Sequence, residues 1–187
     1  MLFNRITGDR VVISENYFEV NRERRDKMTI TIRNMQLTDI EAVAHIATKS
    51  WHATYEGIIP QHIQHRFLEM AYSKERLKHR CEKTSMYVAT ENENIIGFAN
   101  FSNVKKDGEV ELSAIYLLPT VWGKGIGSQL LAYGIEQLSP STIFINVEAE
   151  NEVGKQFYIA RNFRMVEEFE EDFEGHTLKT IRMVLTL

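Results

Sequence analysis

Three alternating glycines, Gly123, Gly125 and Gly127, stand between an apolar stretch that ends at Pro119 and a segment with helical periodicity. Glycines allow a tight turn that exposes successive backbone N–H groups, and a helix N-terminus adds the positive end of its dipole. The stretch therefore predicts an anion-binding loop; the alternative is that the glycines only cap a helix. A triphosphatase loop is disfavoured, because the Gly-Lys pair at 123–124 is followed by glycine, and the dinucleotide fingerprint is incomplete.

A second segment, residues 151–163, combines polar and aromatic side chains on one short predicted helix. Asn151 is expected to be its N-cap, and Asn162 to end it in the left-handed conformation that asparagine tolerates. Phe157 is expected to face the core. The neighbouring Tyr158 is then expected to project elsewhere and to be free for chemistry.

Together the two segments resemble the GNAT superfamily of N-acetyltransferases. The first is similar to its acetyl-CoA loop, Gln/Arg-x-x-Gly-x-Gly/Ala, and the second to its Asn-x-x-Ala-x-x-Phe-Tyr-x-x-x-Gly-Phe helix. The similarity covers residues 29–187, and residues 51–60 are similar to a group of small bacterial members. Three positions depart from the pattern: Trp122 replaces Gln or Arg, Gly154 replaces Ala, and Asn162 replaces Gly. The backbone donors of the loop do not depend on the side chain at 122.

The resemblance implies an enzyme that moves an acetyl group from acetyl-CoA to a primary amine by direct attack. The acceptor would be a small molecule or a protein amino group, and a homodimer is left open. Tyr158 would protonate the departing thiolate. The residues that would bind the co-substrate lie along the strand before the loop, in the loop, and at the start of the second helix: Ile115, Tyr116, Leu117, Gly123, Lys124, Gly125, Ile126, Gly127, Ser128 and Asn151.

The acceptor amine must lose a proton before it attacks, so a base or a water relay is expected. Glu111 is the candidate base, because it is in register with a glutamate that some family members use. Strand alternation is expected to place Glu109, Glu111, Ser113 and Ile115 on one face. The alternative is that Glu111 is a solvated strand residue.

The surroundings of the acceptor are less well defined. One group of residues is expected either to shape the acceptor pocket or to belong to the core: Trp51, His52, Tyr55 and Ile59. The acidic run at 167–174 would either attract a cationic acceptor or form an exposed hairpin. No metal is expected, because the candidate ligands do not form a compact set: His52, His62, His65 and Cys81.

An α+β arrangement has to position these residues. The order of elements predicts a mixed sheet with helices on both faces, and the resemblance implies the GNAT fold, with a mostly antiparallel central sheet of six to seven strands. Helices are predicted over 38–51, with a capping box at Thr38 and Glu41, and over 61–69, 74–82, 125–138 and 152–161. Strands are predicted over 29–33, 86–90, 95–104, 109–118, 143–147, 164–169 and 178–185.

Composition sets the outer limits. The 187 residues include 22 basic and 26 acidic ones, with a formal net charge of −4. This indicates one globular domain and argues against a protein held on nucleic acid by phosphate contacts. No apolar run is long enough to span a membrane, no signal peptide is recognisable, and the single Cys81 excludes an internal disulfide; we therefore expect the cytoplasm.

The first residues differ in pattern from the rest. Residues 1–27 are interpreted as an N-terminal extension, either an added hairpin or an upstream mis-start before Met28, and residues 28–187 as the catalytic domain. Two other functions are kept as alternatives: a non-catalytic acyl-CoA sensor on the same scaffold and a nucleotide-binding regulator.

Overall fold

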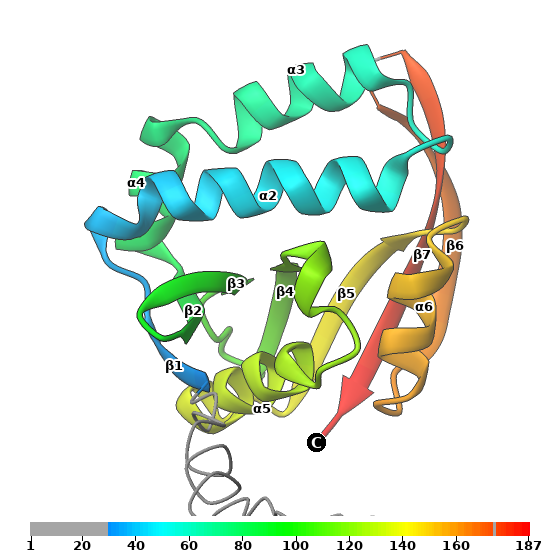
Figure 1. Cartoon of the computed structure of the whole chain (residues 1–187). Coiled ribbons are helices and arrows are strands. Elements are labelled where there is room, and N and C mark those ends of the chain that lie inside the picture. The colour runs from blue at the N-terminus through cyan, green and yellow to red at the C-terminus, as the bar shows by residue number, and fades with distance from the viewer. Residues whose placement is uncertain (1–29, 174) are drawn as a thin grey trace, which may run out of the picture.

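Seven strands form one sheet in the computed structural model, which describes residues 30–173 and 175–187 (Figure 1). Their order is β1-β2-β3-β4-β5-β7-β6, and only the β4–β5 pair is parallel. The predicted mixed, mostly antiparallel sheet is thereby confirmed. The strands are β1 (Ile30–Asn34), β2 (Ser85–Glu91), β3 (Asn94–Phe101), β4 (Glu109–Leu117), β5 (Thr142–Glu148), β6 (Arg164–Phe173) and β7 (His176–Thr186).

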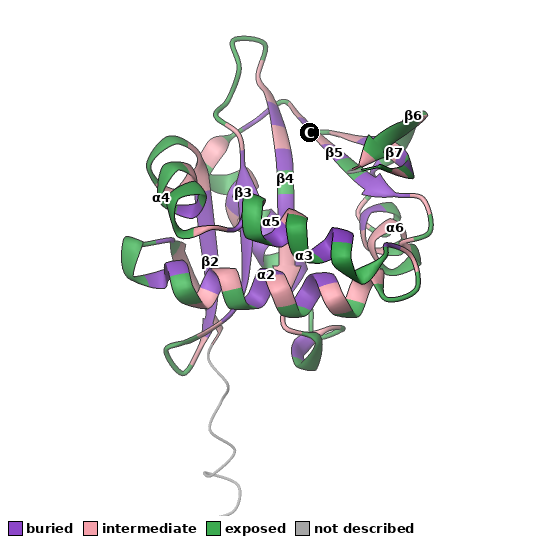
Figure 2. Ribbon diagram, turned by 90° about the horizontal axis from the view of Figure 1, so that it is seen from above, coloured by how far each residue is buried: buried purple, intermediate pink, exposed green. Residues whose placement is uncertain are grey.

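Helices cover both faces of this sheet. One apolar core lies between the sheet and α2, α3 and α4, and the other lies between the sheet and α5 and α6. We call the side of the sheet covered by α2, α3 and α4 the α2 face, and the opposite side the α5 face. Figure 2 shows the buried positions along the central strands and exposed ones on the outer surfaces of α3 and α4. The helices are α2 (Ile40–Tyr55), α3 (Gln61–Ala71), α4 (Lys74–Lys83), α5 (Ile126–Leu138) and α6 (Glu152–Ile159), with short 3₁₀ turns η1 (Leu37–Asp39) and η2 (Pro119–Val121).

The predicted elements agree with these bounds to within a few residues at most ends. The predicted helix over 38–51 continues to Tyr55, and the one predicted to end at Arg161 ends at Ile159. Asn162 has a φ of 65°, as expected for the residue that reverses the chain after this helix. The proposed extension over 1–27 and the proposed start at Met28 lie outside the described residues.

β4 and β5 part soon after they meet. Their pairing covers only three positions, Glu109–Glu111 against Thr142–Phe144. Beyond these positions β4 pairs with β3 alone and β5 with β7 alone, so the two strands diverge and leave a gap in the middle of the sheet (Figure 1). Backbone N–H and C=O groups that face the gap have no strand partner.

A β-bulge in β4 changes which side chains share a face. Asn100 of β3 pairs with Ala114 and Phe101 pairs with Leu112, so Ser113 is an extra residue. Leu112 packs in the core of the α5 face and Ala114 in that of the α2 face. Glu111 therefore lies on the α2 face and Ile115 on the α5 face, and the prediction of one shared face is wrong. Simple alternation fails here because the bulge inserts one residue.

The start of α2 is tied to β1 by an ion pair. Asp39 is 6% exposed and accepts hydrogen bonds from two Arg33 guanidinium nitrogens at 2.6 and 3.0 Å, and from the Gln36 N–H at 2.8 Å. The predicted capping box of Thr38 and Glu41 is wrong, because the η1 turn precedes α2 and Asp39 takes the cap position.

Burial alone would raise the pKa of Asp39, but the hydrogen bonds from Arg33 and Gln36 outweigh it and hold the pKa below its ordinary value. Folding therefore favours the ionised form. The resulting stabilisation is present above about pH 4, the pKa in an unfolded chain, and is lost as the pH falls through the lower folded value.

Asp39→Asn should lower the free energy of unfolding at pH 7 by about 1–3 kcal/mol, because the charge-assisted bonds are lost while Arg33 stays in place. The difference from the unchanged protein should shrink as denaturation is measured below pH 4. Glu136→Gln, on the exposed side of α5, is the control and should change little. A difference for Asp39→Asn that stays constant down to pH 3 would contradict this account.

Candidate active site

The glycine loop forms a cradle of backbone donors. Gly123 and Gly125 have φ values of 74° and 80°, a conformation that favours glycine, and Gly125 is the N-cap of α5. The first helical hydrogen bond runs from Gln129 N–H to Gly125 C=O at 3.2 Å. The N–H groups of the first turn therefore have no helical acceptor, and the positive end of the dipole points into the loop. An anion such as a diphosphate fits this arrangement.

The predicted loop residues come together in this cradle. Lys124 is exposed, whereas Ile126 is buried in the core and can offer only its backbone. A methyl group on Gly127 would lie 2.8 Å from the Phe157 ring, so the backbone of α5 and the ring of α6 approach closely here. Ser128 accepts hydrogen bonds from the Arg161 guanidinium.

Trp122 folds back onto Leu117, the last residue of β4. Its indole N–H donates to the Leu117 C=O at 3.1 Å. This single donor is therefore used within the protein, and the side chain supplies no charge to the cradle.

A cavity of about 190 Å³ continues from the cradle into the gap between β4 and β5. β4 supplies one wall, α6 and the end of β5 supply the other, and α2 closes the far end. This brings together most of the residues that the sequence singled out. Its lining comprises Ser50, Thr54, Tyr55, Leu112, Ser113, Ala114, Ile115, Tyr116, Leu117, Trp122, Gly123, Gly127, Asn146, Val147, Asn151, Val153, Gly154, Phe157 and Tyr158.

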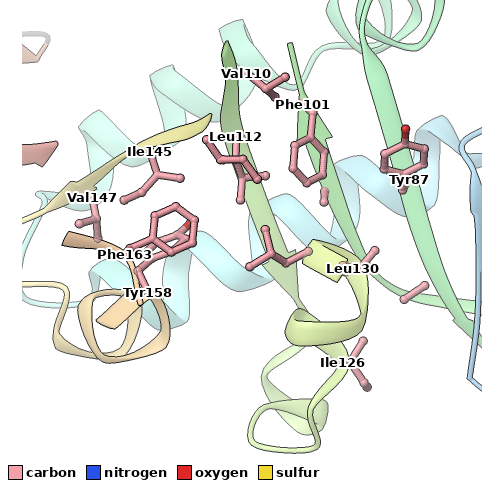
Figure 3. Packing of buried hydrophobic residues seen from close by; sticks show 14 of the residues in the cluster. Tyr87, Phe101, Val110, Leu112, Ile126, Leu130, Ile145, Val147, Tyr158 and Phe163 are labelled. Carbon is pink, nitrogen blue, oxygen red and sulfur yellow. The ribbon is translucent and has the colours of Figure 1, made fainter. Parts of the chain in front are cut away.

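Tyr158 reaches this cavity from α6. Its side chain is 8% exposed, and its ring packs edge-on against Phe157 and Phe163. Figure 3 shows the rings of Tyr158 and Phe163 beside Ile145 and Val147 of β5. Burial raises the pKa of Tyr158 well above its ordinary value, and the nearby Tyr116 adds to the effect. The phenol therefore stays protonated at physiological pH.

The prediction for the two aromatic neighbours is half right: Phe157 faces the core as expected, but Tyr158 does not project away from it. Tyr158 belongs to the buried core, whereas Phe157 is only half-buried and packs at its edge. Both line the cavity. On a short helix beside a gap in the sheet, a side chain can be buried and face the cavity at the same time.

Asn151 caps α6 as predicted and also lines the cavity. Its Oδ1 accepts from the Gly154 N–H at 2.8 Å. A methyl group at 154 would lie 2.7 Å from the Asn151 Nδ2. The glycine at 154, which departs from the family pattern, therefore gives the asparagine room to take this position.

Glu111 lies at the closed end of the gap and does not line the cavity. Its carboxylate is paired with the Arg182 guanidinium at 2.9 and 3.3 Å, and Arg182 also donates to the Asn146 Oδ1 at 2.9 Å. Asn146 does line the cavity. Glu111 is thus linked to the cavity wall through Arg182 and Asn146.

Tyr116 contributes both to the cavity and to the core of the α2 face. Its backbone lies along the cavity, while its hydroxyl accepts a hydrogen bond from the Trp51 indole N–H at 3.0 Å on the α2 face. Trp51 also stacks on Phe67 and Phe173, which joins α2, α3 and β6. Of the residues expected near the acceptor, Trp51 is therefore core, and Tyr55 lines the cavity.

The other two, His52 and Ile59, line a second cavity of about 680 Å³ between α2, the start of α3, Pro119 and His176. The buried Gln64 donates its amide N–H groups to the Tyr55 and Ile59 carbonyls, and its Oε1 lies 2.9 Å from the His52 Nδ1. Since Oε1 can only accept, neutral His52 carries its proton on Nδ1.

Sequence reasoning missed Ser50, Thr54 and Asn146 as lining residues. A polar residue between the buried Ile145 and Val147 was a usable signal for Asn146, whereas nothing in the sequence relates α2 to this gap. Within residues 30–173 and 175–187, no three His, Cys, Asp or Glu side chains cluster as metal ligands. In the same part of the chain, no helix combines the length and the apolar character of a membrane span.

Comparison with known proteins agrees with this geometry. Residues 42–163 match the model of the acetyltransferase (GNAT) family. The chain is 27% identical to a spermidine N(1)-acetyltransferase of Thermoplasma acidophilum, covering 78% of this chain and 95% of that one. It is 32% identical to an uncharacterized N-acetyltransferase of Bacillus subtilis, YuaI, covering 81% and 90%.

Among solved structures, the PaiA N-acetyltransferase of Thermoplasma acidophilum, crystallised with coenzyme A, superposes with a TM-score of 0.74 at 25% identity. The match covers 86% of this chain and all of that one. The chain therefore belongs to the GNAT family of acetyltransferases: it is an N-acetyltransferase that uses acetyl-CoA as its acetyl donor.

Proposed function

We propose that the enzyme acetylates a primary amine, in a small cationic molecule or a protein, by direct attack on the thioester of acetyl-CoA. The observation that carries this proposal is the position of Tyr158 in the wall of a cavity that runs from the glycine cradle to α2. The only cysteine of the chain, Cys81, is on α4 and lies within 3.5 Å of the Met35 C=O. It does not line this cavity, which favours attack without a covalent enzyme intermediate.

The co-substrate would lie along the gap in the sheet. The backbone of residues 123–128 would hold its diphosphate. The segment Ile115, Tyr116 and Leu117 would offer the pantetheine arm those backbone groups that face the gap, apart from the Leu117 C=O, which accepts from Trp122. Asn151 would hydrogen-bond the arm from the opposite wall. The thioester would then lie between β4 and Tyr158.

Tyr158 would act as the general acid. A free thiol has a pKa of about 8.5, so a thiolate in water would not take a proton from a phenol whose pKa lies above 10. The same burial that raises the pKa of Tyr158 would also raise that of a thiol expelled into the cavity. The phenol is therefore a competent donor only to a leaving group in its own apolar surroundings.

Glu111 would act as the base through a water molecule in the gap. An alkylamine with a pKa near 10 is about 99.9% protonated at pH 7, and removing its proton costs about 4 kcal/mol. Glu111 is on the α2 face, at the end of the gap where β4 and β5 still pair. Because Arg182 occupies the carboxylate, a relay is more plausible than direct contact.

A cationic acceptor is favoured by two observations. The curated relative from Thermoplasma acidophilum is named for spermidine, a polyamine. The hairpin of β6 and β7, whose Phe173 packs on Trp51, carries the acidic residues Glu167, Glu168, Glu170, Glu171 and Asp172. The negative electrostatic potential of these side chains raises the local concentration of cations.

The direct test is free-thiol release from acetyl-CoA in the presence of polyamines, simple alkylamines and lysine-containing peptides. The expected result is turnover with polyamines, which carry several positive charges, and less turnover with simple alkylamines, which carry one. If the protein binds acetyl-CoA but turns over none of these amines, a non-catalytic acyl-CoA sensor is supported instead. If it binds ATP more tightly than CoA, a nucleotide-binding regulator is supported.

Tyr158→Phe should lower kcat by about 100- to 1000-fold, because the proton donor to the thiolate is lost. The dissociation constant for CoA, measured by calorimetry, should change little. Tyr133→Phe on α5 removes a hydroxyl outside the cavity and is the matched control. An unchanged kcat in Tyr158→Phe would remove this residue from the acid role.

Glu111→Gln should lower kcat/KM at pH 7 by about 10- to 100-fold, and the loss should diminish as the pH approaches the pKa of the amine. Glu109→Gln, which changes the same charge on the same strand, should have little effect. Because Gln could also disturb Arg182, thermal unfolding of each variant is compared. A uniform loss of rate at all pH values, with lowered stability, would assign Glu111 a structural role only.

A further inference from the structure

The cradle lies beside the Arg161 guanidinium, which no acidic side chain within residues 30–173 and 175–187 neutralises. We propose that Arg161 is the cation that binds the diphosphate of acetyl-CoA, and that it does so together with the Ser128 hydroxyl. The inference rests on the acetyl-CoA site described above. It assigns a ligand to a residue that lies outside the glycine loop and immediately after α6.

Three contacts fix the position of Arg161. Its Nε donates to the Ser128 Oγ at 3.1 Å, its Nη2 donates to the same oxygen, and its Nη1 donates to the Phe157 C=O at 2.5 Å. The guanidinium lies 3.7 Å above the Phe157 ring. The same ring lies against Gly127. The charge is therefore held at the first turn of α5.

Charge balance distinguishes Arg161 from two arginines that lie on strands of the sheet. Arg33 is paired with Asp39, and Arg182 with Glu111. Among the described residues no carboxylate pairs with Arg161, and burial lowers the pKa of its guanidinium. A half-buried cation without a counter-ion is unfavourable until an anion binds beside it.

Hydrogen-bond capacity remains for such an anion. A guanidinium has five N–H donors, of which the contacts with described residues use three. Because the Ser128 Oγ accepts from Arg161, its own O–H proton is available to donate. These donors add to the free N–H groups of the first turn. Trp122 cannot replace them, since its indole N–H is bound to Leu117.

The position within the cradle favours the diphosphate over the 3′-phosphate of the ribose. Arg161 contacts the third residue of α5, directly beside the backbone donors that suit a diphosphate. A side chain serving only the 3′-phosphate would not need to share Ser128 with this turn. The two phosphates can be separated experimentally, because 3′-dephospho-CoA lacks one and pantetheine lacks both.

Arg161→Gln should weaken CoA and 3′-dephospho-CoA alike by about 10- to 100-fold in calorimetry, since a charge-assisted contact to phosphate is lost. Binding of pantetheine, measured with the same variant, should not change. The slope of log Kd against log salt should fall by about one. Arg161→Lys keeps the charge but lacks the planar set of guanidinium N–H donors. Its affinity for CoA should therefore lie between that of Arg161→Gln and that of the unchanged protein.

Arg164→Gln, three residues along the chain on exposed β6, removes the same charge and should change CoA binding less than about twofold. Ser128→Ala should weaken both nucleotides several-fold, because it removes the hydroxyl and two of the three contacts that hold Arg161. Thermal unfolding of each variant in the absence of CoA checks that it folds. If Arg161→Gln does not fold, Arg161→Lys and Ser128→Ala carry the test.

Unchanged CoA binding by folded Arg161→Gln would overturn the proposal, as would an equal loss with pantetheine, which indicates a purely structural role. A loss with CoA but not with 3′-dephospho-CoA would overturn the assignment to the diphosphate. Failure of the unchanged protein to bind CoA at all would instead refute the proposed use of the cavity, and so is distinguishable from all three.

Discussion

The parting of β4 and β5 is the constraint from which the rest of the architecture follows. Two parallel strands that separate after three paired positions leave backbone groups without partners in the middle of a sheet. Such groups are tolerable only where something else binds them. The α2 face and the α5 face are two separate cores on opposite faces of the sheet, and the bulge in β4 decides which of its side chains enter each core.

The two walls of the gap are held in place by contacts outside it. Trp51 joins α2 to β4 through Tyr116 and to the β6–β7 hairpin through Phe173. Arg182 joins β4, β5 and β7 by its bonds to Glu111 and Asn146. These contacts connect the elements around the gap, and the glycine loop forms the other end of the cavity. Preorganised walls of this kind reduce the cost of ordering a flexible co-substrate.

Local patterns predicted the parts of the site that depend on local chemistry. Three glycines before an amphipathic helix, and an asparagine before another, determine backbone geometry within a few residues, and both occur where expected. Predictions that depend on contacts between distant strands of the sheet were incomplete or wrong. The bulge at Ser113 cannot be detected from alternation, and the pairing of Glu111 with Arg182 joins positions 71 residues apart. The orientation of Tyr158 depends on where β5 diverges, which no local pattern records.

The bond between the Trp122 indole and the Leu117 carbonyl has an optical consequence. The chain has two tryptophans, and the other, Trp51, is 5% exposed in the core of the α2 face. Trp122 lines the cavity beside the strand along which a pantetheine arm would lie. Its emission is therefore a built-in reporter of occupancy, and replacing Trp51 by phenylalanine would leave a single tryptophan, at the mouth of the site.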